Sequence, residues 1–258
     1  MTRYFLTLEY DGTGFCGWQR QTTGLAVQEV LEHAVAGFTG EPATVQAAGR
    51  TDTGVHALAM VAHVDLERVY PVGTVRNALN YHLRPHPVAV LEARLVADDL
   101  HARFSALARH YRYRIVNRRA PLALDLGRAW LIPQPLDAER MHEAGRALVG
   151  RHDFSSFRAA ECQASSPVKT LDRLVVERWR DEVFVAVSAR SFLHHQVRNI
   201  VGTLSLVGKG DWPVGRLGEV LAAQDRTAAG PTAPAAGLYL TGVDYPAFTS
   251  RRDAAPTG

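Results

Sequence analysis

The sequence is poor in cysteine and lysine, and it contains no long hydrophobic run. With only Cys16 and Cys162, the 258-residue chain cannot build a disulfide framework, and no Cys/His cluster has the ligand spacing of a zinc site. No stretch approaches the roughly 20 apolar residues that span a bilayer. The opening segment MTRYFLTLEYDG lacks the uninterrupted apolar region of a signal peptide. We therefore expect a soluble, cytoplasmic protein without a metal site.

Nearly all of the positive charge is carried by arginine, because Lys169 and Lys209 are the only lysines. The formal net charge is +3 and the isoelectric point is about 9.0, which alone indicates little about a partner. A guanidinium pairs with phosphate and stacks on bases, so the arginines are compatible with a nucleic-acid partner. A GC-rich genome would produce the same arginine usage. No P-loop pattern is present, and no cofactor is expected.

Hydrophobic periodicity predicts an α+β protein with largely antiparallel strands. Helices are predicted from Val27 to the stop at Gly40 and over 72–82, 136–149 and 194–207. Strands are predicted over 3–10, 43–48, 58–64, 88–96, 110–116, 169–179, 183–190 and 238–243. We divide the chain into subdomains 1–105 and 106–248, each a sheet packed by helices. Residues 249–258 are predicted to form a disordered tail.

The segment GRTDTGVHA, residues 49–57, combines two glycines, an arginine, an aspartate and a histidine in a loop between two predicted strands. Gly49 and Gly54 allow tight backbone geometry or the close approach of a ligand. Asp52 lies between two threonines and is a candidate catalytic carboxylate. An ordinary turn, in which the aspartate caps a backbone N–H, is the alternative interpretation.

This segment resembles the signature of the TruA-type tRNA pseudouridine synthases, and the resemblance continues through most of the chain. The matching segments, in order, are YDGTGFCGWQRQ at 10–21, HARFSALARHYRYRI at 101–115, DFSSFRA at 153–159, SFLHHQVRNIVG at 191–202 and AGPTAPAAGLYL at 229–240. The residue after the aspartate is commonly alanine in this family and is Thr53 here. The resemblance implies two α+β subdomains with the active-site cleft between them.

The resemblance implies that Asp52 is the catalytic aspartate. The reaction breaks the N1–C1′ bond of uridine, turns the uracil and joins C5 to C1′. A carboxylate can act as a nucleophile at C1′ or C6, or as a base at C2′, and the sequence does not choose among these routes. Each route requires an ionised Asp52, which a neighbouring guanidinium favours.

Arg198 is the predicted basic partner of the aspartate, because its segment matches the family block that supplies one. Helical spacing predicts that it shares one stripe with His194, Gly202 and Ser205, apart from the apolar stripe of the same helix. A solvated helix face is the alternative for these residues.

Three kinds of substrate contact are implied by the resemblance. Tyr111 corresponds to the tyrosine that stacks on the target base, and it is a candidate for proton transfer at C5, whereas Tyr113 on the same strand face is expected in the core. Arg50 resembles the arginine that helps to displace the target nucleotide. Arg20 and Arg109 are candidates for phosphate contacts, although most arginines are solvated surface residues.

The family implies a homodimer that binds the anticodon arm of tRNA and modifies uridines 38, 39 and 40 in standard tRNA numbering, without cofactor or metal. Two other functions are considered. One is a noncatalytic RNA-binding module, which would not need a carboxylate where phosphate binds. The other is a hydrolase that pairs Asp52 with His56 or His194, although no nucleophile elbow or paired carboxylates support it.

Overall fold

The computed structural model describes residues 1–246, 248 and 250, and the chain forms two compact units. The first unit holds Met1–Leu107 together with the described residues from Tyr239 onward, and the second holds Ala108–Leu238. The tail predicted over 249–258 lies, except for Ser250, outside the described residues. Among the described residues, no helix combines the length and the apolar character needed to cross a membrane.

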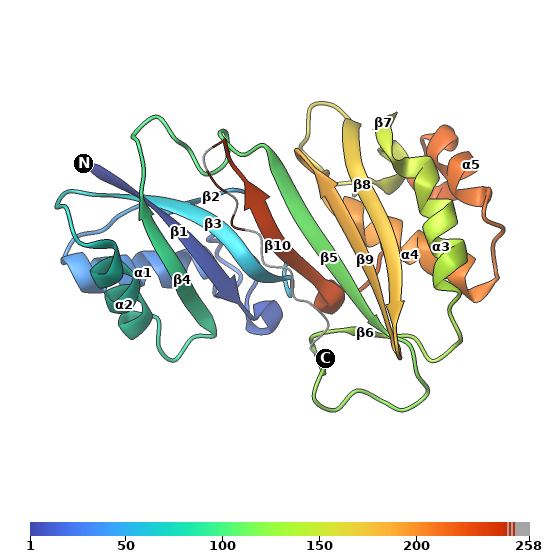
Figure 1. Ribbon diagram of the computed structural model, residues 1–258, viewed down its shortest axis with the longest axis horizontal. Helices are drawn as coiled ribbons and strands as arrows, with labels where there is room; N and C mark the ends of the chain where they lie inside the picture. The colour runs from blue at the N-terminus through green and yellow to red at the C-terminus, as the bar shows by residue number, and fades with distance from the viewer. Residues whose placement is uncertain (247, 249, 251–258) are drawn as a thin grey trace. The chain divides into compact units, whose positions relative to one another are not determined.

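The first unit is a mixed sheet with two helices (Figure 1). Its strands follow the order β4-β1-β3-β10, with β2 paired to β3. β1 is antiparallel to both neighbours, whereas β10 pairs with β3 in parallel. The two helices contact each other, and α2 also contacts β4. The bounds are β1 (Thr2–Tyr10), α1 (Val27–Thr39), β2 (Gln46–Ala47), β3 (His56–Leu66), α2 (Val72–His82), β4 (Val88–Leu95) and β10 (Leu238–Asp244).

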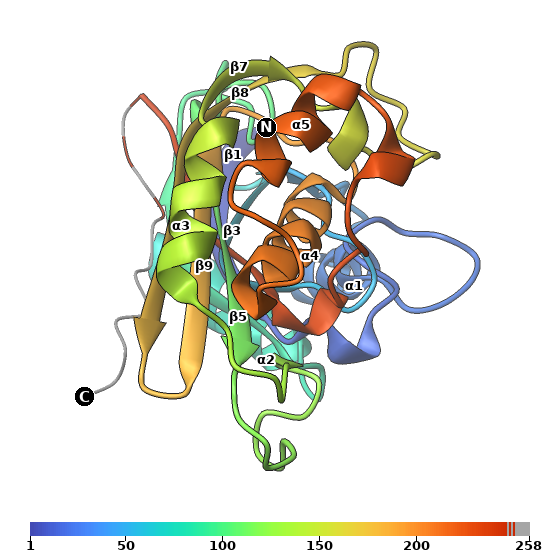
Figure 2. The same ribbon diagram turned by 90° about the vertical axis from the view of Figure 1, so that its right-hand side faces the viewer.

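The second unit combines a largely antiparallel sheet with a group of helices that contact one another (Figure 2). Its strands follow the order β5-β9-β8-β7, and β6 pairs with β5 in parallel. α3 contacts β8, α4 and α5. The bounds are β5 (Ala108–Val116), β6 (Trp130–Leu131), α3 (Ala138–Gly145), β7 (Gly150–Asp153), β8 (Val168–Trp179), β9 (Glu182–Ala189), α4 (Gln196–Lys209) and α5 (Arg216–Ala223). The predicted α+β class with largely antiparallel strands is confirmed.

The helix stop predicted at Gly40 is confirmed. α1 ends at Thr39, and Gly40 adopts a left-handed φ of 80° while its N–H donates to the Ala36 carbonyl. Glycine adopts the left-handed conformation after the last helical turn at little cost in free energy, because it has no Cβ. The buried positions of α1 recur three and four residues apart, as the sequence predicts: they are Val27, Val30, Leu31, Ala34 and Val35.

β3 begins inside the GRTDTGVHA segment, at His56, rather than at the predicted position 58. Nine of its eleven residues are buried, so the strand is covered on both faces and its continuous apolar run is explained. The segment predicted as a strand over 43–48 pairs only at Gln46–Ala47. The residues of the motif before His56 form the loop that leads into β3.

A buried histidine makes the stability of the first unit depend on pH. His63 is 3% exposed, and its Nδ1 accepts a hydrogen bond from the Ala102 N–H. Burial, and secondarily the positive charge of Arg3, lower the pKa of His63 to about 4. An unfolded histidine has a pKa of about 6.5, so between these values the unfolded chain binds a proton that the folded chain does not.

We therefore expect the free energy of unfolding to fall as pH decreases from about 6.5 to about 4, by up to about 1.4 kcal/mol per pH unit from this residue. Above that window the histidine is neutral in both states and contributes no pH dependence. Urea unfolding at several pH values would show a smaller slope for His63→Gln than for the unaltered chain. Equal slopes would contradict the assignment of this pH dependence to His63.

Candidate functional site

The loop that carries Asp52 is fixed by the segment that follows β1. The backbone N–H of Trp18 donates to the Thr51 carbonyl at 3.1 Å, and that of Gly54 donates to the Phe15 carbonyl at 3.3 Å. These bonds lie on either side of Asp52 in the sequence. The carboxylate is therefore attached to a backbone that is tied to a second segment both before and after it.

Two glycines let the two segments approach this closely. A Cβ on Gly12 would lie 2.0 Å from the Val55 carbonyl oxygen, and one on Gly17 would lie 2.7 Å from the Thr51 carbonyl oxygen. Gly17 also has a φ of 101°, a conformation that side chains disfavour. The matching segments at 10–21 and 49–57 are therefore one structural feature, and the sequence alone did not indicate that they meet.

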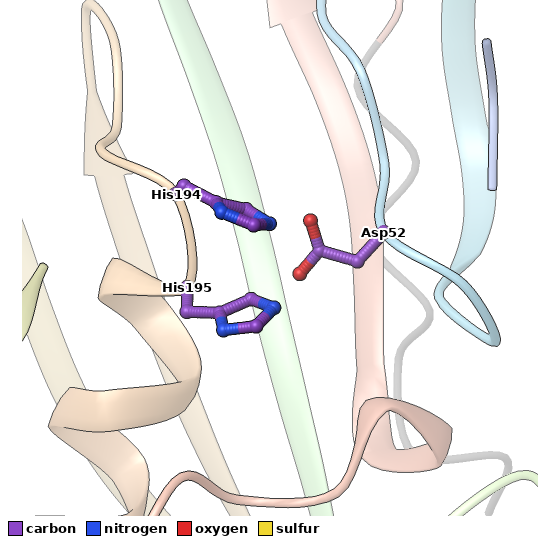
Figure 3. A group of neighbouring side chains, drawn as sticks. All are labelled: Asp52, His194 and His195. Atoms are coloured by element: carbon purple, nitrogen blue, oxygen red, sulfur yellow. The ribbon is translucent and has the colours of Figure 1, made fainter. Parts of the chain in front are cut away.

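Asp52 is half-buried, and its side chain projects from the loop before β3 (Figure 3). On one side Thr51 is buried, and its Oγ1 shares a hydrogen bond of 2.9 Å with the Tyr10 hydroxyl. Arg50 is exposed. The loop thus presents a carboxylate and a guanidinium two residues apart, with a buried threonine anchoring the backbone between them.

His56 has two local partners in the first unit. It is 2% exposed, its Nδ1 accepts the Gly12 N–H at 3.0 Å, and its ring stacks on Tyr239 with centroids 4.6 Å apart. Asp11 Oδ1 also lies 3.2 Å from Nδ1. Nδ1 cannot accept from Gly12 and donate to Asp11 at once, so the Gly12 bond requires a ring without a proton on Nδ1. His56 is buried in the frame of the loop, and the hydrolase alternative gains no support from it.

In the second unit, Arg198 is half-buried on α4 and held by reciprocal bonds with Ala233. Its Nε donates to the Ala233 carbonyl at 2.8 Å, and the Ala233 N–H donates to the Arg198 carbonyl at 3.1 Å. One side of the guanidinium plane is therefore fixed by backbone.

The prediction of a polar stripe on this helix is wrong for three of its four residues. His194 precedes α4, which begins at Gln196, and both Gly202 and Ser205 are buried. The Ser205 hydroxyl is satisfied within the helix, where it donates to the Gly202 carbonyl at 2.7 Å. Around Gly202 this helix packs against residues 230–233, which helical spacing alone could not reveal.

The turn before α4 is unusual. The rings of His194 and His195 lie beside each other, with centroids 4.0 Å apart (Figure 3). His195 has a φ of 61°, in the left-handed region that few residues other than glycine adopt. Such conformations cluster at functional sites. No feature of the sequence predicted this one.

The two tyrosines of β5 have different environments. Tyr113 is fully buried, its hydroxyl donates to the Pro234 carbonyl at 2.7 Å, and burial raises its pKa against the opposing charge of Arg198. It is a core residue, as expected. Tyr111 is half-buried, and its ring meets that of Phe192 edge to face at 5.2 Å. Tyr111 therefore keeps part of its surface accessible, and Phe192 is a neighbour that the sequence did not indicate.

The other two arginines predicted to contact phosphate, Arg20 and Arg109, differ in solvent exposure. Arg20 is 50% exposed, and its guanidinium lies 4.0 Å from Glu29 and 3.7 Å from Glu32. Arg109 is only 9% exposed, and its Nη1 donates to a backbone carbonyl 2.6 Å away. Arg20 and Arg50 belong to the unit that carries Asp52, and Arg109 belongs to the unit that carries Tyr111 and Arg198.

Comparison with known proteins gives a consistent match over most of the chain. The family described as tRNA pseudouridine synthase matches residues 7–105 and 144–246. The chain is 63% identical over 258 residues to the tRNA pseudouridine synthase A of Paramagnetospirillum magneticum, with 100% of both chains covered. It is 62% identical over 245 residues to the protein of the same name from Rhodospirillum centenum, covering 95% of this chain and 100% of that one.

A third relative, the tRNA pseudouridine synthase A of Parvibaculum lavamentivorans, is 58% identical over 245 residues, with 95% of this chain and 100% of the relative covered. Among solved structures, the one titled "Crystal Structure of a Cbf5-Nop10-Gar1 Complex" gives a TM-score of 0.36 at 12% identity, over 92% of this chain and 49% of that one. That likeness is too low to carry an argument.

Proposed function

The chain belongs to the tRNA pseudouridine synthase family, and from this premise we propose that it isomerises uridines 38, 39 and 40 in the anticodon stem-loop of tRNA, with Asp52 as the essential catalytic residue. Membership makes the protein an isomerase that forms pseudouridine in tRNA. The noncatalytic RNA-binding module and the hydrolase are thereby set aside. The positions modified and the residues that act are the parts we propose.

The main support for the role of Asp52 is the way in which hydrogen bonds hold its loop in place. A half-buried carboxylate on a loop tied at Thr51 and Gly54 can meet a nucleoside without first being ordered. A catalytic group that is held in place before substrate binds loses little entropy in the reaction. Asp52 would act as a nucleophile at C1′ or C6, or as a base at C2′, and all three routes use the same ionised carboxylate.

Arg198 and Tyr111 are proposed to complete the chemistry. Arg198 is assigned as the cation that favours the ionised aspartate, and the fixed orientation of its Nε supports such a task. Tyr111 is assigned to stack on the target base and to serve as a candidate in proton transfer at C5. A base taken out of its helix loses stacking, and an accessible aromatic ring replaces part of that loss.

The substrate contacts we propose are Arg50, Arg20 and Arg109. The exposure of Arg50 supports a role in displacing the target nucleotide. Arg20 is half exposed and suits a phosphate contact, whereas Arg109 is the least accessible of the three. We further propose a homodimer located in the cytoplasm, where two free cysteines would remain reduced.

The positional claim has a direct test. Anticodon stem-loops that carry a single uridine at position 38, 39 or 40 are expected to yield pseudouridine at each of the three positions, because the proposal assigns all three neighbouring uridines to the same carboxylate. Sequencing after chemical labelling of pseudouridine would locate the product. A stem-loop with cytidine at all three positions is the control. Product at one position only would overturn the positional claim and leave the family assignment intact.

A further inference from the structure

A buried amide lies next to Arg198 on α4. Asn199 is 1% exposed, and its Nδ2 donates to the Phe157 carbonyl at 2.9 Å. Its Oδ1 accepts from the Thr232 hydroxyl at 2.6 Å and from Arg226 Nη2 at 3.2 Å. A polar side chain this deeply buried is stable only when its donors and acceptors are matched.

The bonding pattern fixes the orientation of this amide. If the oxygen and nitrogen of Asn199 were exchanged, the NH₂ group would face the guanidinium of Arg226, and the oxygen would face the Phe157 carbonyl. Both contacts would then be repulsive. Asn199 therefore offers a single acceptor to the Thr232 hydroxyl, and that hydroxyl is fixed in turn.

Further bonds tie the same segment to α4. Arg226 Nη1 donates to the Gly230 carbonyl at 2.9 Å, and its Nη2 donates to Thr232 Oγ1 at 3.1 Å. The Gly230 N–H donates to Thr203 Oγ1 at 3.0 Å. Side chains of α4 and Arg226 thus hold the segment 230–232. This segment directly precedes the residue that contacts Arg198.

That next residue is Ala233, whose carbonyl accepts Nε of Arg198. A shift of Thr232 moves Ala233, because the two are covalently adjacent, and a shift of Ala233 moves the acceptor that sets the guanidinium plane. We propose that Thr232, held by Asn199 and Arg226, is a positioning residue that orients Arg198 for the isomerisation. This inference rests on the proposed role of Arg198.

The first test replaces the Thr232 hydroxyl. Thr232→Val keeps the shape of the side chain and removes its bonds to Asn199 and Arg226, so we expect kcat to fall about tenfold with tRNA affinity within about twofold. Thr232→Ser keeps the hydroxyl and should restore the rate. Thr170→Val is the control, because Thr170 is an exposed residue of β8 and none of the bonds described above involves it.

The second test repeats Thr232→Val in an Arg198→Ala background. If Thr232 acts through Arg198, the hydroxyl has nothing left to orient, and the second substitution should change kcat by less than about twofold. An undiminished tenfold loss in that background would overturn the proposal, as would a Thr232→Val enzyme with the normal rate. Should Thr232→Val not fold, as judged by urea unfolding, Arg226→Lys removes the forked contact to the same segment and is tested in the same way.

The Arg198→Ala and Thr232→Val variants distinguish an error in the role of Arg198 from an error in the role of Thr232. If Arg198→Ala retains the full rate, the role of Arg198 in the proposed function is wrong, and the positioning role of Thr232 is wrong with it. If Arg198→Ala loses activity while Thr232→Val does not, only the positioning role is wrong.

Discussion

Asp52→Asn should form pseudouridine at least about 10⁴-fold more slowly than the unaltered protein, with its affinity for tRNA retained. Asparagine has nearly the same shape as aspartate, but its amide neither ionises nor accepts a proton at neutral pH. Each of the three routes open to Asp52 therefore loses its reacting group. Affinity should be equal or slightly higher, because removing a negative charge lowers the repulsion of phosphate.

The control for this substitution is the adjacent residue. Thr53 is exposed, and alanine is the common residue at this position in the family it resembles, so Thr53→Ala should keep a rate within about twofold of the unaltered protein. Single-turnover rates and filter-binding affinities for the three proteins separate chemistry from binding. A rate for Asp52→Asn within tenfold of the unaltered protein would remove Asp52 from the chemistry.

Gly202→Ala should destabilise the second unit by about 3 kcal/mol and also slow the reaction. A Cβ at this position would lie 1.7 Å from the Pro231 carbonyl oxygen and 3.1 Å from the Ala233 backbone nitrogen. Both neighbours are backbone atoms, so no side-chain rotation relieves the overlap. The segment must move away from α4, and its Ala233 carbonyl would no longer hold Arg198 in the same orientation.

The same substitution in another helix should have the opposite sign. Gly218 lies in α5, and a Cβ there would meet no atom within 4 Å apart from its chain neighbours and the backbone of its own helix. Alanine is favoured over glycine in a helix by about 0.5–1 kcal/mol, so Gly218→Ala should be slightly stabilising. Urea unfolding of both variants measures the difference directly. Equal stabilities for Gly202→Ala and Gly218→Ala would contradict the close packing of α4 on the segment that contains Pro231.

Local patterns predicted the elements with clean periodicity and long runs. The helix predicted over 72–82 has the same bounds as α2. The strands predicted over 169–179 and 183–190 correspond to β8 and β9, which pair with each other, and Arg180 between them has a left-handed φ of 53°. β7 and α5 were not predicted. β7 has only four residues, so the alternation of a strand does not repeat enough times to be recognised. The eight residues of α5 include Gly218, which is unfavourable inside a helix.

Non-local contacts account for the other differences. β10 pairs in parallel with β3 through Tyr239 and Leu240, so a strand near the end of the predicted 106–248 subdomain lies in the first unit. A pairing of only two residue pairs between strands far apart in the sequence cannot be predicted from the local sequence of either strand.

The sequence predicted the surroundings of the proposed catalytic residues only in part. Asp52 and Arg198 were selected by resemblance, whereas the bond from Arg198 to Ala233 spans 35 residues and has no local signature. Gly202 offered only a weak signal. Glycine inside a helix is unfavourable by about 1 kcal/mol relative to alanine, which is compatible with a close backbone neighbour at Gly202 but does not require one, because Gly218 in α5 has none.

The central claim is that this protein isomerises uridine in tRNA by means of the Asp52 carboxylate. Joining C5 of uracil to C1′ displaces the hydrogen on C5, so tRNA tritiated at uridine C5 releases its label to water only when isomerisation occurs. We predict release by the unaltered protein and none by Asp52→Asn, with both proteins binding the tRNA. Binding of unmodified tRNA without any release by the unaltered protein would contradict the account.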